Sequence, residues 1–275
     1  MTEPPNSFES YPREGILTAQ AALVETWSLL ENFHEDLVLV GGLAVYQHTK
    51  EKPSPRYRPT PTLDVDFGIA LAADAGLCAT AAFALEMAGF KQDEKGRLFR
   101  KSEHGILYLD FLTEHPPATQ GTRNVSDLIT SLCPGINRAL GTPIKRTVKG
   151  LDQYGDERTF HIPICDYGPL LVLKLNAFAN RSSAKKSKDA YDILSLVYSC
   201  LEGPEAAIAS FGREKSKSNE GMKSALQALE SGFLDSEQEG PVRAAHFYYG
   251  EQASKEDNLR LREELVTVAR ALLDA

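Results

Sequence analysis

The sequence is poor in cysteine and tryptophan and has no long apolar run, and each shortage argues against a class of protein. Its 275 residues include four cysteines and one tryptophan. The cysteines are far apart, with no Cys-X-X-Cys pair and no histidine at zinc spacing, so we expect reduced thiols. No apolar run approaches the roughly 20 residues of a membrane span, and the first residues lack the pattern of a signal peptide. We therefore expect a cytoplasmic protein without a membrane partner.

The chain also has fewer basic than acidic residues. The chain has 30 Lys and Arg against 38 Asp and Glu, a net charge of −8, which argues against a broad, nonspecific nucleic-acid surface. Two local basic stretches remain, although each by itself is better explained by a solvated face. The first comprises Lys145, Arg146 and Lys149, and the second comprises Arg181, Lys185, Lys186 and Lys188.

The strongest positive signal is a pair of aspartates inside an apolar run. Asp64 and Asp66 alternate with Leu63, Val65 and Phe67, a period that predicts a strand with one apolar and one acidic face. Both carboxylates then project to the same side, which is costly unless a cation lies between them. An isolated Asp-X-Asp triplet is common on solvated strand edges, so the surrounding sequence decides its meaning.

Two glycines stand upstream of this strand. The apolar run 37–40 predicts a short strand that ends at Gly41 and Gly42, and a helix is expected from there to about residue 49. Glycine permits positive φ and close approach of a ligand, and a helix N-terminus offers free N–H groups to phosphate. Alone, the glycines favour an ordinary strand-to-helix turn. Beside paired carboxylates, they predict a Mg²⁺-dependent phosphate-handling site.

The remaining periodicity predicts an α+β chain in which a mixed sheet with flanking helices (residues 1–166) is followed by an all-helical domain (residues 167–275). Residues 1–15 are expected to be weakly ordered, and the stretch 115–150 has no clear assignment. The helices expected in the first part cover residues 17–32 and 74–88, and its further strands cover 97–100, 106–112 and 158–164, the first two forming a hairpin around 103–105. The helices expected in the second part cover residues 170–180, 188–201, 225–234 and 259–273.

A third acidic residue, Asp110, lies within the apolar run 106–112. A carboxylate inside an apolar strand must be ion-paired, hydrogen-bonded or metal-bound, because burying the charge alone costs several kcal/mol. The alternative is a strand end wetted by the following loop. With Asp64 and Asp66, Asp110 would complete a three-carboxylate site. The first two would hold the catalytic metals, and Asp110 would bind the second metal and accept the attacking hydroxyl's proton.

The helical half carries a cluster of charged and polar residues, made of Lys174, Asn180, Arg181, Lys185, Lys188, Asp189 and Asp192. Lys188 and Asp192 are four residues apart, and such a helical pair contributes only ~0.3–0.5 kcal/mol. A salt-bridged solvent face therefore explains the pattern without a ligand. The functional alternative is a cationic surround for triphosphate, in which Lys174 and Arg181 face the active site and Asp189 or Asp192 orients them or touches the nucleotide.

The order of these motifs resembles the nucleotidyltransferase fold of the DNA polymerase β superfamily over residues 36–200. The resemblance rests on Gly41-Gly42, Arg58-X-Thr60-X-Thr62-X-Asp64-X-Asp66, a later strand aspartate, and Lys174 with Asp189 and Asp192. Within the superfamily, the chain looks most like AbiEii-type toxins, which are related to the MenT tRNA nucleotidyltransferase toxins.

The resemblance implies a nucleotidyltransferase that uses two Mg²⁺ ions to transfer a nucleotide from an NTP to an acceptor hydroxyl, with release of pyrophosphate. Characterised relatives in some cases modify a tRNA 3′ end and pair with an antitoxin protein. The implied metal ligands are Asp64, Asp66 and Asp110, and the implied catalytic residues are these three and Lys174. The implied nucleotide-binding residues are Gly41, Gly42, Arg58, Thr62, Lys174, Arg181, Asp189 and Asp192.

Two departures from the family pattern leave alternatives open. The family's first motif is often Gly-Ser, whereas Gly42 here removes a hydroxyl that could touch phosphate. Some toxin relatives place their further essential acid in the helical half, so Asp189 or Asp192 competes with Asp110. An RNA acceptor is expected against Arg56, Arg58 and the 185–188 stretch. The acidic net charge favours instead a small-molecule or protein hydroxyl, and a non-catalytic nucleotide-binding module of the same fold is the remaining alternative.

Overall fold

The computed structural model describes residues 7–11, 14–51, 54, 56–69, 75–94, 96–102, 105–125, 128–151, 154, 156–181, 183–250 and 254–275, without the side chains of 75–80, 102, 105, 125, 183 and 184. The chain forms two compact units. The sheet unit contains Pro12–Ala44 and Thr62–Asp166, and the helical unit contains Val45–Pro61, Tyr167–Ala275 and the described residues up to Tyr11.

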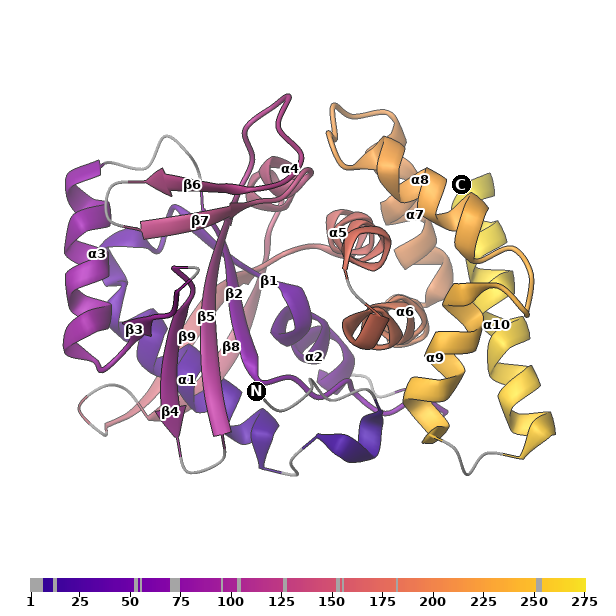
Figure 1. Cartoon of the computed structure of the whole chain (residues 1–275), viewed down its shortest axis with the longest axis horizontal. Helices are drawn as coiled ribbons and strands as arrows, with labels where there is room; N and C mark the ends of the chain where they lie inside the picture. Colours follow the sequence, from indigo (N-terminus) through magenta and orange to yellow (C-terminus); the bar gives the residue numbers. More distant parts are fainter. Residues whose placement is uncertain are drawn as a thin grey trace. The chain divides into compact units, whose positions relative to one another are not determined.

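The sheet unit is built on nine strands in the order β3-β4-β5-β2-β1-β9-β8, with β7 beside β5 and β6 beside β7 (Figure 1). The central strand β2 runs antiparallel to β1 and parallel to β5. The strands are β1 (Leu37–Val40), β2 (Asp64–Ile69), β3 (Lys91–Gln92), β4 (Leu98–Ser102), β5 (Gly105–Thr113), β6 (Thr122–Val125), β7 (Leu128–Leu132), β8 (Ile144–Leu151) and β9 (Glu157–Ile164).

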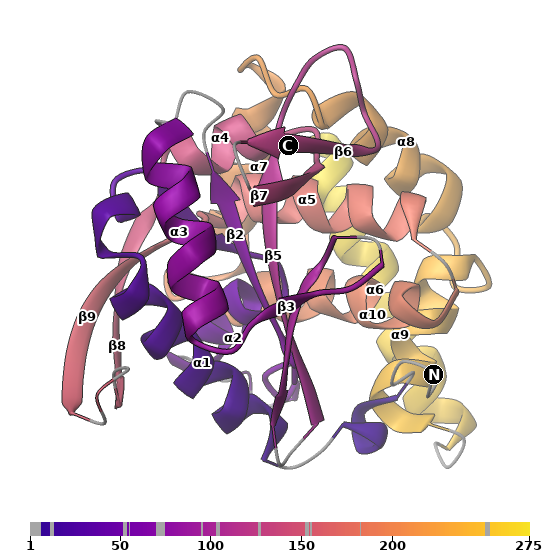
Figure 2. The same cartoon turned by 60° about the vertical axis from the view of Figure 1, so that its left-hand side comes forward.

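Helices α1 (Gly15–Leu29) and α3 (Ala75–Met87) cover one face of this sheet (Figure 2). The Trp27 ring of α1 lies 6.0 Å from the ring of Phe67, between centroids, and Phe67 is fully buried. Because strand residues alternate, this core packing turns Asp64 and Asp66 to the opposite face. The short helix α4 (Ile136–Gly141) packs on that opposite face, where a Cβ at Gly68 would touch Ile136.

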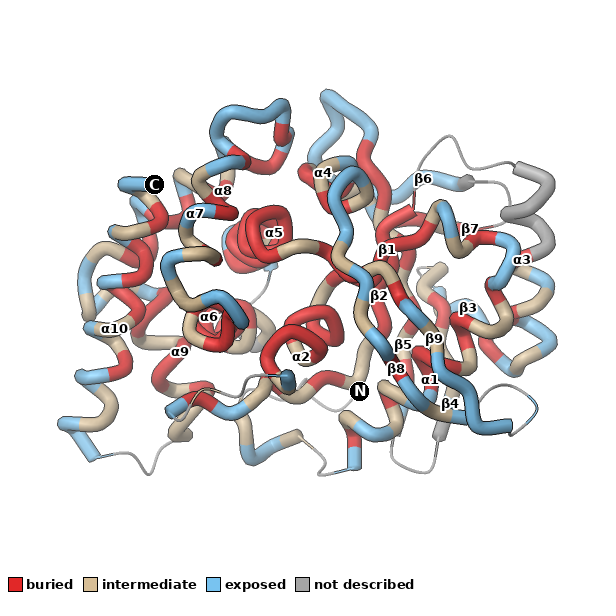
Figure 3. The backbone as a smooth tube through the Cα atoms, turned by 180° about the vertical axis from the view of Figure 1, so that it is seen from behind, coloured by how far each residue is buried: buried red, intermediate tan, exposed pale blue. Residues whose placement is uncertain are grey.

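The helical unit contains six helices after the sheet, and α5 is buried along most of its length (Figure 3). Helices α6, α7 and α8 pack directly on α5. The helix α2 (Gly41–Glu51) begins in the sheet unit and ends in the helical unit. The six helices are α5 (Tyr167–Asn180), α6 (Ser183–Tyr198), α7 (Pro204–Lys215), α8 (Met222–Gly232), α9 (Glu239–Tyr249) and α10 (Lys255–Asp274).

The predicted fold class is confirmed, because a mixed sheet with flanking helices is followed by helices alone. The predicted strands and the hairpin are present within a few residues of their expected bounds. The structure adds β3, α7 and α9, and it places β6, β7, α4 and β8 in the stretch that had no assignment. The predicted end of the helix over residues 188–201 is wrong, since α6 ends at Tyr198.

Some expectations fall outside the described residues, namely the first six residues, the helix start at Asp74 and the hairpin tip at Glu103 and His104. Near the start of the chain, the described residues include a short 3-10 helix, Phe8–Ser10. Cys133, Cys165 and Cys200 are free thiols. Among the helices described here, none is long and apolar enough to cross a membrane.

Candidate functional site

Asp64, Asp66 and Asp110 lie on one face of the sheet unit, on two neighbouring parallel strands. The pairing register sets Asp66 beside Asp110 and Asp64 beside Tyr108. Residues at paired positions point to the same face, so the three carboxylates converge. Asp66 is buried, while the side chains of Asp64 and Asp110 are 28% and 19% exposed. The structure thus brings together the three acids that the sequence analysis combined into one site.

Gly41 makes room for the Asp66 carboxylate. Its φ of +66° lies in the left-handed region that favours glycine, and a Cβ at this position would overlap the Asp66 side chain. Val40, the register partner of Asp66, ends β1, and α2 begins at Gly41. A carboxylate beside a helix N-terminus is also electrostatically favourable. Packing against Asp66 therefore explains this glycine as a turn residue.

The two remaining candidates of the sheet unit are Gly42 and Thr62, which lie next to Gly41 and near Asp64 in the sequence. Gly42 is a buried residue in the first turn of α2. The buried Thr62 accepts a hydrogen bond at its Oγ1 from the Asp64 backbone N–H, at 3.4 Å. This contact helps to define the start of β2 at the first aspartate.

Arg97, which the sequence analysis did not single out, lies among these carboxylates. Its Nε donates to both oxygens of Asp110, at 2.6 and 2.9 Å, and its Nη2 also donates to Asp110. The same Nη2 is 3.5 Å from Oδ2 of Asp64, and the guanidinium carbon is 3.9 Å from the ring centroid of Tyr108. Burial alone would lower the pKa of Arg97, but the hydrogen bond to Asp110 and the charges of all three aspartates raise it above its usual range.

The pairing of β4 with β5 explains why Arg97 meets Asp110. Ser102 pairs with Gly105 and Leu98 pairs with Leu109, so the next pair outward sets Arg97 opposite Asp110. A hairpin with 103–105 as its turn, as expected from the sequence, would instead set residue 97 opposite Phe111, on the other face of the sheet. The observed register therefore decides that Arg97 joins the acids.

Within the described residues, no group of three His, Cys, Asp or Glu side chains is placed to hold a metal ion. In the acidic cluster, Asp110 is bonded to Arg97. The donor chemistry itself fits Mg²⁺, which prefers carboxylate oxygens. Asp64 and Asp66 would hold the ion, and Asp110 would join them when its bonds to Arg97 are released.

Two residues of the first basic stretch, Lys145 and Lys149, lie on the same sheet face as the acids. Lys145 and Lys149 are exposed on β8. Following the strand register from β2 through β1 and β9 to β8 puts both lysines on the face of Asp66 and Arg146 on the opposite face. The sheet unit therefore shows its acidic cluster and two exposed lysines on one side.

In the helical unit, Lys174 of α5 joins Asp189 and Asp192 of α6 in a buried ion-pair network. The Lys174 Nζ lies 3.0 Å from Oδ1 of Asp189 and 2.5 Å from Oδ2 of Asp192. Arg181 pairs with Asp189 at 3.0 Å, and Lys188 pairs with Asp192 at 2.9 Å as its four-residue spacing predicted. The side chains of Lys174 and the two aspartates are at most 5% exposed. The cluster is therefore a buried network, and its interpretation as a solvated face is wrong.

The network joins three basic side chains, Lys174, Arg181 and Lys188, to the carboxylates of Asp189 and Asp192. Burial alone would lower the pKa of Lys174, but Asp192 and Asp189 raise it overall. Burial lowers the pKa of Lys188, and it opposes ionisation of Asp189, whose pKa Arg181 and the two lysines nevertheless hold below its usual value. The Arg181 side chain is 44% exposed and is the member of the network that a ligand reaches first.

Arg58 and Arg56 are both engaged within the helical unit. The Arg58 guanidinium carbon lies 3.9 Å from the ring centroid of Phe8 and 5.3 Å from that of Tyr248, and Arg56 pairs with Glu264 at 2.5 Å. Their side chains are still 51% and 63% exposed. Both arginines thus anchor the 56–61 segment and keep charge at the surface.

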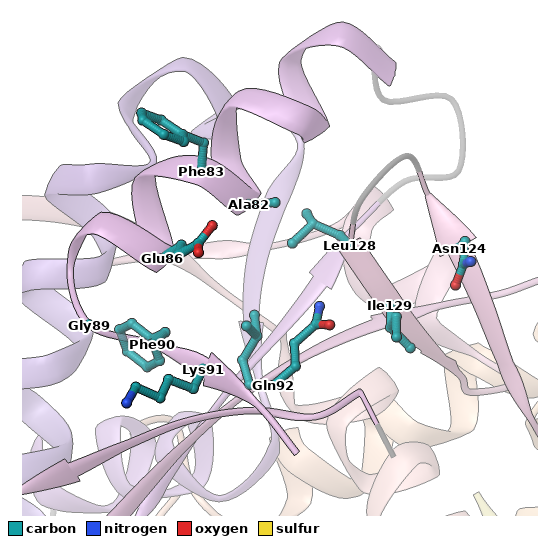
Figure 4. A pocket seen from close by; sticks show the side chains of 11 residues that line it. Ala82, Phe83, Glu86, Gly89, Phe90, Lys91, Gln92, Asn124, Leu128 and Ile129 are labelled. Carbon is teal, nitrogen blue, oxygen red and sulfur yellow. The ribbon is translucent and has the colours of Figure 1, made fainter. Parts of the chain in front are cut away.

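The predicted site residues divide between the two units. Those of the sheet unit are Gly41, Gly42, Thr62, Asp64, Asp66 and Asp110, and those of the helical unit are Arg58, Lys174, Arg181, Asp189 and Asp192. A cavity of about 980 Å³ in the sheet unit, lined among others by Phe83, Gln92 and Leu128, contains none of them (Figure 4).

No known protein family matches the sequence of this chain. A comparison with curated proteins likewise finds no match. The arrangement of the acidic cluster and of the strands that carry it is therefore the basis for a functional assignment.

Proposed function

We propose that the protein is a Mg²⁺-dependent nucleotidyltransferase related to the AbiEii-type toxins of the DNA polymerase β superfamily. The observation that carries the proposal is the acidic cluster, in which Asp64 and Asp66 on β2 converge with Asp110 on the parallel neighbour β5. Gly41 admits the Asp66 carboxylate at the N-terminus of α2. Carboxylates next to free helical N–H groups suit a metal-bound triphosphate.

The proposed reaction joins an acceptor hydroxyl oxygen to the α-phosphorus of an NTP and breaks the bond to the leaving pyrophosphate. When bound, Mg²⁺ neutralises charge on the phosphates. Asp64 and Asp66 hold the metal, and Asp110 accepts the proton of the attacking hydroxyl. The N–H groups around Gly41 and Gly42 bind phosphate oxygens.

The helical unit contributes positive charge to this proposal. Lys174 and Arg181 are proposed to bind nucleotide, as the resemblance implies, and Arg181, whose side chain is 44% exposed, is the more accessible of the two. The buried aspartates 189 and 192 hold these cations in place. The rigid ion pairs favour such a role because they fix the charged groups before a ligand arrives.

The proposed acceptor is RNA, in particular the 3′ end of a tRNA, and the proposed biological role is that of a toxin paired with an antitoxin. The exposed Lys145 and Lys149, on the sheet face of the acidic cluster, support a polyanionic acceptor through charge complementarity. The net charge of −8 supports the second candidate, transfer to a small-molecule or protein hydroxyl.

A transfer assay tests the proposal. Purified protein is incubated with Mg²⁺, each labelled NTP and separate pools of tRNA, protein and small hydroxyl compounds. The Asp64→Asn variant is expected to lose transfer and to keep its melting temperature, whereas Asp36→Asn, just before β1, keeps both. Transfer that persists in Asp64→Asn contradicts the assigned metal site, and the labelled pool decides between the two acceptor classes.

A further inference from the structure

The side chain of Arg97 contacts the carboxylates that would otherwise be available to bind a metal ion. Its guanidinium donates to both oxygens of Asp110 and is 3.5 Å from Asp64. We propose that Arg97 is an internal counter-cation of the acidic cluster, which competes with a divalent cation for Asp110 and turns away when the metal binds. This inference rests on the proposed function, because it takes Asp64 and Asp66 as the metal-binding pair.

The need for a counter-cation follows from the spacing of the carboxylates. Asp66 and Asp110 are register partners on adjacent strands, and Asp64 is two residues from Asp66 on the same face. Three like charges at this spacing repel one another, and a partly buried site screens them poorly. A fork-shaped guanidinium can donate two parallel hydrogen bonds to one carboxylate. Arg97 therefore lowers the electrostatic free energy of the acidic cluster when no metal is bound.

The surroundings of Arg97 allow its side chain to move while its backbone stays fixed. Its N–H donates to Oδ1 of Asp93 at 2.9 Å, its carbonyl accepts from the Asp93 N–H at 2.9 Å, and Gly96 supplies the positive φ of this turn. The Arg97 side chain is 26% exposed and rests on the Tyr108 ring. Release of the guanidinium from Asp110 therefore requires the side chain to turn on a fixed backbone.

Arg100 of β4, three residues after Arg97, provides a matched control. It donates to the two carboxylate oxygens of Glu25 at 2.7 and 2.6 Å, lies over the Phe90 ring at 4.9 Å, and is 25% exposed. Its chemistry and exposure equal those of Arg97, but its carboxylate partner is on α1 and belongs to no acidic cluster. A general effect of removing an arginine from this part of the chain would appear at both positions.

The test is calorimetric titration of Mn²⁺ into metal-free protein, without nucleotide. Arg97→Gln is expected to bind Mn²⁺ roughly tenfold more tightly than wild type, since a charge-assisted bond no longer competes. Arg97→Lys, which keeps the charge without the fork, should fall between the two, and Arg100→Gln should equal wild type. The gain of Arg97→Gln should vanish when Asp64→Asn is added.

A thermal readout accompanies the titration. Without metal, Arg97→Gln should melt below wild type because Asp110 and Asp64 lose the ion pairs with Arg97, and saturating Mn²⁺ should close the gap. If this variant does not fold in the absence of metal, Arg97→Lys carries the comparison and must still bind Mn²⁺ more tightly than wild type.

The outcomes separate this inference from the proposed function. Equal or weaker Mn²⁺ binding by both Arg97 variants, with Asp64-dependent binding in the wild type, overturns the role of Arg97 and leaves the metal site standing. Absence of Asp64-dependent Mn²⁺ binding in every variant overturns both proposals.

Discussion

Replacing Lys174 by methionine is expected to destabilise the protein strongly. The change removes one cation that lies 3.0 Å from Asp189 and 2.5 Å from Asp192, whose side chains are 1% and 0% exposed. Asp189 keeps Arg181, and Asp192 keeps Lys188, so neither carboxylate is left alone. Removing one partner of a buried pair costs about 3–5 kcal/mol when it leaves a charge uncompensated, so the lower end, about 3 kcal/mol, is expected here. At about 2–4 °C per kcal/mol for chains of this size, the melting temperature should fall by roughly 6–12 °C.

Scanning calorimetry at neutral pH measures this loss, and Lys186→Met is the control. Lys186 pairs with Glu239 at 3.0 Å, and the Glu239 side chain is 43% exposed, so its removal should cost at most about 1 kcal/mol. A melting temperature of Lys174→Met within 2 °C of wild type would refute the reasoning. Transfer by this variant must be assayed well below its melting temperature, so that lost catalysis is separated from lost structure.

Three further predictions follow from single features. Gly41→Ala should cost about 1–3 kcal/mol from its positive φ and should weaken Mn²⁺ binding by displacing Asp66, as measured by melting and titration; unchanged affinity would contradict the packing argument. Lys145→Gln with Lys149→Gln should weaken tRNA binding and reduce its salt dependence, and an unchanged salt slope would exclude this surface. In the folded protein, the pKa of Asp189 lies below its usual 3.8. As the pH drops below about 3.8, the unfolded chain binds a proton at this carboxylate before the folded chain does, so the free energy of unfolding decreases. In Asp189→Asn, the free energy of unfolding should depend less on pH in the acid range than in wild type. An unchanged pH dependence would contradict the proposed contribution of the ion pairs.

Local pattern was sufficient for the elements with strong periodicity. Alternating apolar residues predicted β2 and β5, and the helix predicted to end at residue 88 ends at Met87, just before Gly89 with its φ of +85°. The missed elements have weaker patterns. β8 has exposed or half-buried positions on both faces except Val148, so its alternation is hidden. Helices α7 and α9 carry proline in their first turn, where it is compatible with a helix although it reads as a break.

The sequence by itself determined that Asp64 and Asp66 share one strand face and that Lys188 can pair with Asp192, because both follow from the repeat of a single strand or helix. Tertiary structure decided which groups meet these charges. The register between β2 and β5 sets Asp110 beside Asp66, and the β4–β5 hairpin brings Arg97 onto both acidic strands. Packing of α5 on α6 turns a charge pattern typical of a solvent face into a buried network. Local periodicity specifies the face of a side chain, whereas strand register and helix packing specify its neighbours, and the neighbours set the cost of each charge.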